Sequence, residues 1–347
     1  MTPEATVQDL VTPLFADAKG RPVAAPDFGG QPIADTHAHL DMLEDPAAAL
    51  ANAAQAGIGF IATVADPSED APRTYKELPL WIEGARELIA GAPSKRTSSQ
   101  EGEPRSGEGP LRGTSAEGVA AISEPDLRGT SAEGVPAISE PLPQVRIILG
   151  VHPHNAKGFT PEVQAILREL ATDPLTCAIG EIGLDYHYDY SPRDVQRDIF
   201  RRQLELAHEL ALPAVVHLRE AHGDGERILR TVGVPPAGCI LHCYNLDAAQ
   251  MRVFLDLGCY ISFAGPVTFK KSPEIREAAA LVPSDRILTE TDCPFMAPEP
   301  FRGRKNEPAY TVFTAARIAE ARGEEPSVFA VAAYANARRV LDGERTP

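Results

Sequence analysis

The chain has 347 residues, of which 43% are hydrophobic and 24% are charged, a composition typical of one large folded domain or two ordinary ones. Its formal net charge is −16, so charge alone could hold a nucleic-acid backbone only through bound cations or a local basic rim. No apolar stretch approaches about 18 residues, and the first twenty residues carry early acids without an apolar core. We therefore expect neither a membrane span nor a secretion signal.

The five cysteines predict reduced thiols in a cytoplasmic protein. Their number is odd, and Cys177, Cys239, Cys243 and Cys259 lie in apolar, strand-like runs, whereas Cys293 does not. This pattern is typical of buried thiols in an intracellular protein rather than of a disulfide framework. Metal ligation by Cys239 and Cys243 is an alternative, but burial in strands is the favoured interpretation.

Residues 1–30 precede the first apolar run and are predicted to form an N-terminal extension. Residues 31–347 are predicted to form a single domain, interrupted at about residues 94–143 by a stretch rich in Gly, Ser, Pro and Glu. Within this stretch a 16-residue unit that begins at Leu111 is repeated from Leu127. Two copies this polar cannot stack around a shared apolar face, so we expect a disordered surface insertion rather than a solenoid.

Short apolar runs alternate with amphipathic stretches along the rest of the chain. The expected strands, in chain order, are residues 32–39, 59–65, 146–153, 177–185, 213–219, 239–244, 259–265 and 286–292. Helical patterns between and after them include residues 161–173, 193–211, 272–282, 310–323 and 326–341. Strands that are apolar on both faces and separated by helices favour a parallel sheet. Eight of them predict an α/β protein with a closed (β/α)8 TIM barrel, and a doubly wound open sheet is the alternative.

Ligand-type side chains recur where these expected strands end. His37 and His39 end the first strand, His152 and His154 the third, and Glu181, His217 and His242 lie in the fourth, fifth and sixth, while Glu290 and Asp292 end the eighth. His37 and His39 are two residues apart, so an extended strand points both side chains the same way. Because the carboxyl ends of all barrel strands meet at one rim, we expect these side chains to converge there.

Imidazole and carboxylate groups together suit Zn, Mn, Fe and related divalent ions, and Mg accepts fewer nitrogen ligands. A set of six residues, four histidines and two carboxylates, exceeds what one catalytic ion needs if it keeps a position open for water. Two divalent ions that share Glu181 would use the set economically. A single strand histidine such as His217 is more often a core residue, but several strands placing such groups at the same end favour a metal site. His208 and His222 are expected to be structural or solvated.

The sequence resembles the TatD family of metal-dependent deoxyribonucleases, in the amidohydrolase superfamily. The resemblance covers nearly the whole chain outside the first thirty residues and the insertion. It rests on the segments "DTHAHLD", "GVHPH", "GEIGLDY", "QLELAHELALPAVVHLREA", "LHCY", "YISFAGPVTF" and "LTETDCPFMAPEPFRGRKNEPAY".

The resemblance implies a role for each residue of the set. His37, His39 and Asp292 would hold a first ion, and Glu181 would bridge it to a second ion held by His217 and His242. Asp292 would also orient the attacking water or accept its proton, so Glu181 and Asp292 are the expected catalytic residues. The positions that surround the substrate in the family correspond to His152, His154, Tyr186, Arg219, Arg302 and Arg304, with Lys305 beside the last two.

The activity that the resemblance implies is divalent-metal-dependent hydrolysis of phosphodiester bonds in DNA, from the 3′ end, by attack of a metal-bound hydroxide. The expected cofactors are two ions of Mg, Mn or Zn, and the expected partner is DNA, single-stranded or at a 3′ end, with no protein partner inferable. Small phosphoesters and modified aminoacyl-tRNA are alternative substrates. Cyclic amides are another, although the fourth strand lacks the lysine that many such hydrolases use. A metal-stabilised binding module is the non-enzymatic alternative.

Overall fold

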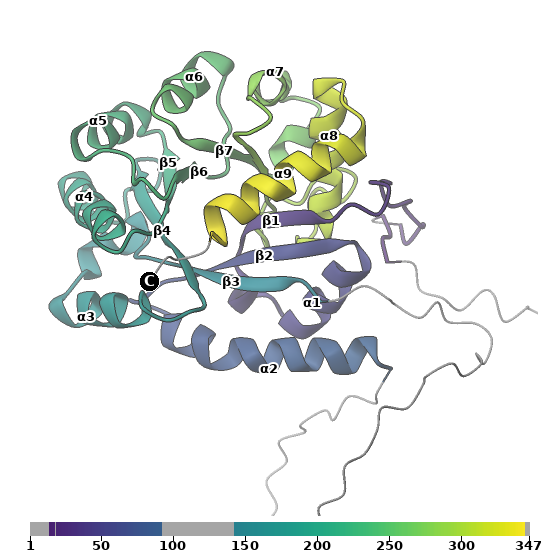
Figure 1. Ribbon diagram of the computed structural model, residues 1–347, viewed down its shortest axis with the longest axis horizontal. Helices are drawn as coiled ribbons and strands as arrows, with labels where there is room; N and C mark the ends of the chain where they lie inside the picture. The colour runs from purple at the N-terminus through teal and green to yellow at the C-terminus, as the bar shows by residue number, and fades with distance from the viewer. Residues whose placement is uncertain (1–13, 18, 92–141, 344–347) are drawn as a thin grey trace, which may run out of the picture.

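The computed structural model describes residues 14–17, 19–91 and 142–343, and its strands form one parallel barrel (Figure 1). The strands pair in chain order: β1 (Ile33–Ala38), β2 (Ile58–Ala65), β3 (Gln144–Leu149), β4 (Thr176–Asp185), β5 (Ala214–Arg219), β6 (Cys239–Leu241), β7 (Tyr260–Phe263) and β8 (Ile287–Thr289). The tandem repeat and nearly all of the predicted insertion lie outside the described residues, as do residues 1–13 of the predicted extension.

The barrel is brought round on itself where β1 meets the chain after β8. Ala38 forms a parallel bridge with Cys293, and the Thr289 hydroxyl donates a hydrogen bond of 2.8 Å to the Ala34 carbonyl. The His39 backbone N–H donates to the Cys293 carbonyl at 2.9 Å. The consecutive strand order and this junction confirm the predicted TIM barrel, and the open doubly wound sheet is wrong.

Helices surround the barrel and connect its strands (Figure 1). They are α1 (Pro46–Gln55), α2 (Ala71–Ile89), α3 (Pro161–Leu170), α4 (Arg193–Glu209), α5 (His222–Val232), α6 (Ala248–Asp256), α7 (Pro273–Leu281), α8 (Thr311–Arg322) and α9 (Pro326–Leu341). Capping residues fix where some of these helices begin. The Asp45 and Thr160 side chains accept hydrogen bonds from backbone N–H groups in the first turns of α1 and α3. Over the described ranges, no helix combines the length and apolarity that crossing a membrane requires.

Helix α9 covers the end of the barrel at which the strands begin. Its residues Ala337, Val340 and Leu341 pack in one buried cluster with inward-facing strand residues that include Phe60 and Ile148. Figure 1 shows α9 lying across the strands. Because this end is filled by packed side chains, the carboxyl ends of the strands are left as the open end of the barrel.

Part of the predicted N-terminal extension also joins the core. The Phe15 side chain is only 2% exposed, and its ring centroid lies 5.0 Å from that of Phe313 and 6.0 Å from that of Phe301. Phe301 belongs to the loop that follows β8. The segment around Phe15 therefore packs against the loop that leads away from the last predicted ligand, Asp292.

Candidate metal centre

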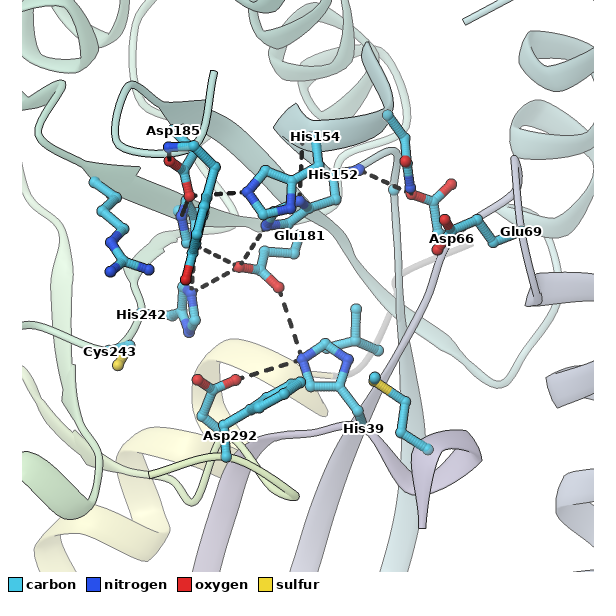
Figure 2. Close-up of a pocket in the computed structure, with 18 of the residues that line it drawn as sticks. His39, Asp66, Glu69, His152, His154, Glu181, Asp185, His242, Cys243 and Asp292 are labelled. Carbon is cyan, nitrogen blue, oxygen red and sulfur yellow. Dashed lines mark hydrogen bonds and ion pairs between the residues drawn. The ribbon is translucent and has the colours of Figure 1, made fainter. Parts of the chain in front are cut away.

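A cavity of about 820 Å³ lies at the carboxyl ends of the strands, and Glu181 of β4 stands at its centre (Figure 2). Glu181 is 3% exposed, and its carboxylate faces side chains from several other strands. Among the residues predicted for the site, the cavity is lined by His39, His152, His154, Glu181, His217, Arg219, His242 and Asp292. His37 is fully buried beneath them.

The two oxygens of Glu181 face two separate sets of histidine nitrogens. Oε2 lies 3.1 Å from His37 Nε2 and 3.9 Å from His39 Nε2. Oε1 lies 2.6 Å from His217 Nδ1 and 2.8 Å from His242 Nε2. Each oxygen of the Glu181 carboxylate therefore has its own set of neighbouring histidine nitrogens.

Asp292 completes the first of these sets. Its Oδ1 lies 3.4 Å from His39 Nε2 and 3.9 Å from His37 Nε2. Potential ligand atoms form three overlapping groups, and within each group the atoms lie within 4.8 Å of one another. The groups are His37, His242 and Asp292; His37, His39 and Glu181; and His152, Glu181 and His217. The six residues that the sequence predicts as ligands are thus brought together, and His152 stands beside them.

Carboxylates behind two of the histidines decide which nitrogen faces the cavity. His242 Nδ1 lies 3.2 Å from Glu290 Oε1, and His217 Nε2 lies 3.3 Å from Asp185 Oδ2. A carboxylate only accepts hydrogen bonds, so each of these nitrogens donates. In a neutral ring, the other nitrogen then presents a lone pair toward Glu181 Oε1, an arrangement that suits a cation held between the nitrogen and the carboxylate. The donor set therefore fits a metal ion.

The charges of the centre support the same conclusion. Burial opposes protonation of His242, yet the Glu181 and Glu290 carboxylates hold its pKa well above the ordinary value. Burial also opposes ionisation of Glu181, but His242, His152 and His37 hold the pKa of that carboxyl well below its usual range. Burial likewise opposes ionisation of Asp292, but its hydrogen bond with His39 holds the pKa of the Asp292 carboxyl below the ordinary value. The cavity thus keeps its carboxylates ionised and attracts positive charge.

His152 and His154 line the cavity and are held by two aspartates that the sequence analysis did not assign. Asp66 accepts a 3.0 Å hydrogen bond from the His152 backbone N–H, and Asp185 Oδ2 lies 2.9 Å from His154 Nε2. Burial lowers the pKa of His152 to about 4. Asp66 follows β2 and Asp185 ends β4. Both therefore lie at carboxyl ends of strands, the same sequence signal that predicted the candidate ligands.

Three other residues predicted to surround the substrate are not among the residues that line this cavity. The Tyr186 hydroxyl donates a 2.7 Å hydrogen bond to Asp224. The Arg302 guanidinium stacks on the Phe269 ring at 4.2 Å, and Arg304 donates a hydrogen bond to a backbone carbonyl of the N-terminal segment. Their roles toward a substrate remain predictions from the sequence.

Two glycines of β4 allow Glu181 to stand beside the fifth strand. A Cβ at Gly183, where φ is +141°, would lie 2.0 Å from the His217 carbonyl oxygen. A Cβ at Gly180 would lie 2.7 Å from the Val215 Cβ. Residues without a side chain at these positions let β4 and β5 approach closely, which brings the Glu181 carboxylate to His217.

Comparison with known proteins gives a consistent set of relatives. The family model described as TatD related DNase matches residues 34–342. The metal-dependent hydrolase YabD of Bacillus subtilis (strain 168) is 42% identical over 193 residues, which are 56% of this chain and 76% of that protein. The protein of Rahnella sp. (strain Y9602) named 3′-5′ ssDNA/RNA exonuclease TatD is 36% identical over 197 residues, or 55% of this chain and 75% of that protein.

A solved structure agrees with the fold. The crystal structure of YJJV, a TatD homologue from Escherichia coli K12, matches with a TM-score of 0.68 and 22% sequence identity. The match covers 91% of this chain and 98% of that protein. At this level of identity the likeness concerns the barrel itself.

Proposed function

Because this chain belongs to the TatD-related DNase family of metal-dependent hydrolases, we propose that it hydrolyses phosphodiester bonds of single-stranded DNA from the 3′ end. One observation carries the proposal: Glu181 offers one oxygen to His37 and the other to His217 and His242. The relative from Rahnella sp. is named an exonuclease of single-stranded DNA and RNA, which supports the substrate class.

The cofactor that we propose is a pair of divalent cations. His37, His39 and Asp292 would hold one, His217 and His242 the other, and the Glu181 carboxylate would contact both. Ions bound in this way lower the pKa of water and stabilise negative charge on phosphate oxygens. The nitrogen-rich donor set favours Zn or Mn over Mg.

Residues of the chain supply the remaining functions. Asp292 is ionised and lies next to His39, so it is placed to accept the proton that the attacking water releases. Arg219 lines the cavity and carries a permanent positive charge, which suits a phosphate of the substrate. His152 is neutral at pH 7 because burial lowers its pKa to about 4, so it can orient a substrate oxygen without adding charge.

The test is hydrolysis of single-stranded DNA labelled at its 5′ end. Protein stripped with a chelator should be inactive, and reloading with Zn, Mn or Mg should restore a ladder of labelled products that shorten from the 3′ end. Glu181→Gln should lower the rate by about a hundredfold or more, because the neutral amide has only one oxygen and cannot contact both cations as a carboxylate would. Glu299→Gln, at an exposed position, is the matched control.

Two outcomes would overturn the proposal. Absence of cleavage with every metal, from folded protein shown to bind metal, would exclude the proposed hydrolysis of single-stranded DNA. Immediate release of the label as a mononucleotide would place attack at the 5′ end and reverse the polarity.

A further inference from the structure

Two exposed tyrosines stand at the rim of the cavity, in the loop that follows β4. Tyr188 is 45% exposed and Tyr190 is 57% exposed, and both line the cavity. Their rings are stacked, with centroids 5.3 Å apart and planes inclined by 19°. Large aromatic side chains are usually covered by protein, so a stacked pair turned toward a cavity offers a ready surface for a flat ligand.

The pair is held in position by groups of the candidate metal centre. The ring of His154 stands nearly perpendicular to Tyr188, at 5.4 Å and 89°, and meets Tyr190 at 4.8 Å and 70°. Asp185 accepts a 2.9 Å hydrogen bond from the Tyr188 backbone N–H, and its other oxygen contacts His154 and His217. One carboxylate thus joins the tyrosine loop to a proposed metal ligand, and the rings lie beside the place of reaction.

A positive charge accompanies the rings. The Arg219 guanidinium lies over the Tyr188 ring, 4.8 Å from its centroid, and Arg219 also lines the cavity. A stacked aromatic pair with a cation over one of its rings matches the two parts of a nucleotide, since the base stacks on the exposed ring and the phosphate pairs with the charge. In a chain of net charge −16, broad electrostatic attraction cannot supply most of the affinity for DNA, so stacking has to contribute.

We propose that Tyr188 and Tyr190 form a stacking platform for one unpaired base near the end of the nucleic acid being cut. A base must be out of the double helix to offer its face to a protein ring, so the platform selects single strands or frayed ends over closed duplexes. This inference rests on the proposed nuclease function and names the feature of the substrate that the cavity recognises.

The experiment compares two double variants on matched substrates. Tyr188→Leu with Tyr190→Leu removes both rings, whereas Tyr188→Phe with Tyr190→Phe keeps them and removes only the hydroxyls. Each protein, reloaded with metal, is assayed on single-stranded oligonucleotides that carry either all their bases or one abasic residue at the last, second or third position from the 3′ end.

For the wild type, the abasic residue at one of these positions should raise KM about tenfold, which corresponds to about 1.4 kcal/mol and lies within the range for base stacking. In the leucine variant the intact oligonucleotide should already show the raised KM, and the abasic residue should add nothing further. The phenylalanine variant should behave as the wild type does. The effect should fall on KM more than on kcat, because stacking acts before the reaction.

The outcomes separate the two proposals. If the wild type cuts DNA but the leucine variant keeps the wild-type ratio of KM between abasic and intact substrates, the platform is wrong and the nuclease stands. If the wild type cuts no nucleic acid with any metal, both proposals fall. Thermal unfolding identifies a misfolded leucine variant, and the single variant Tyr190→Leu, at the more exposed ring, then decides by the same ratio.

Discussion

Asp185 contacts His154 and His217 with a single oxygen, at 2.9 Å and 3.3 Å. These hydrogen bonds hold its pKa below the ordinary value although burial opposes ionisation. The ionised group fixes which nitrogen of His217 faces Glu181, and such supporting carboxylates commonly determine metal affinity.

Asp185→Asn should therefore weaken metal binding by roughly 10- to 100-fold, since an amide can turn its NH2 group toward the ring and favour the wrong tautomer. Isothermal titration of the stripped protein with Zn or Mn measures the change. Asp285→Asn, at an exposed position paired with Arg286, is the matched control. An unchanged affinity in Asp185→Asn would show that this carboxylate does not orient His217.

Glu307 gives a prediction that concerns stability rather than activity. Burial raises the pKa of its carboxyl, and a hydrogen bond of 3.1 Å from Asn52 opposes the shift only in part. Because the pKa is higher in the folded chain than in the unfolded chain, the ionised form disfavours folding. This cost is absent below the unfolded pKa of about 4.3 and is complete once the pH exceeds the folded pKa.

Glu307→Gln keeps an oxygen for Asn52 but cannot ionise. The variant should match the wild type in free energy of unfolding near pH 4 and become the more stable protein as the pH rises to 7. Urea unfolding across this range measures the difference, with Glu299→Gln as the exposed control. A constant difference between pH 4 and 7 would contradict the assignment to ionisation.

At the scale of elements, the close approach of β4 to β5 is what aligns Glu181 with His217. Gly183→Ala would put a Cβ against the His217 carbonyl, in a backbone conformation that side chains rarely adopt. We expect a loss of about 2 kcal/mol or more in the free energy of unfolding, together with weaker metal binding because β4 and β5 must separate.

A second glycine supplies the control for this variant. Gly223 lies in α5, and a Cβ there would meet nothing within 4 Å. Gly223→Ala should be neutral or stabilising by no more than about 1 kcal/mol. Urea unfolding measures the free energy of unfolding of the two variants, and titration with metal measures their affinity. Equal values for both variants would show that the close approach of β4 and β5 does not require glycine at position 183.

At the scale of the whole molecule, net charge decides how the protein meets its substrate. The chain carries −16, and Arg219 is the arginine that lines the cavity among the described residues. With about one phosphate contact, KM for single-stranded DNA should rise only about threefold between 50 and 200 mM monovalent salt. Proteins that make six or more phosphate contacts lose roughly a thousandfold in affinity for the nucleic acid over that range of salt. A rise in KM of that size for this protein would reveal phosphate contacts well beyond Arg219.

The sequence by itself determined the architecture and which ligand-type side chains meet at one rim of the barrel. Alternation of apolar runs with helical patterns predicts the parallel barrel, which the strand order confirms. The barrel then brings strand ends together whatever their separation in the chain, so residues as distant as His37 and Asp292 could be assigned to one rim from their positions at strand ends alone. This inference needs only the position of each strand end and the parallel direction of the strands, which local sequence patterns indicate.

Tertiary structure alone decided what each side chain does at that rim. Beyond a strand end, loop geometry sets the direction of a side chain, and contacts from distant elements set loop geometry. The Tyr186 hydroxyl therefore donates a hydrogen bond to Asp224 of α5, while Tyr188 and Tyr190 line the cavity. For the same reason Asp185 could be recognised as the support of His217 only once β4 and β5 were seen side by side, because a hydrogen bond depends on distances that spacing along the chain does not contain.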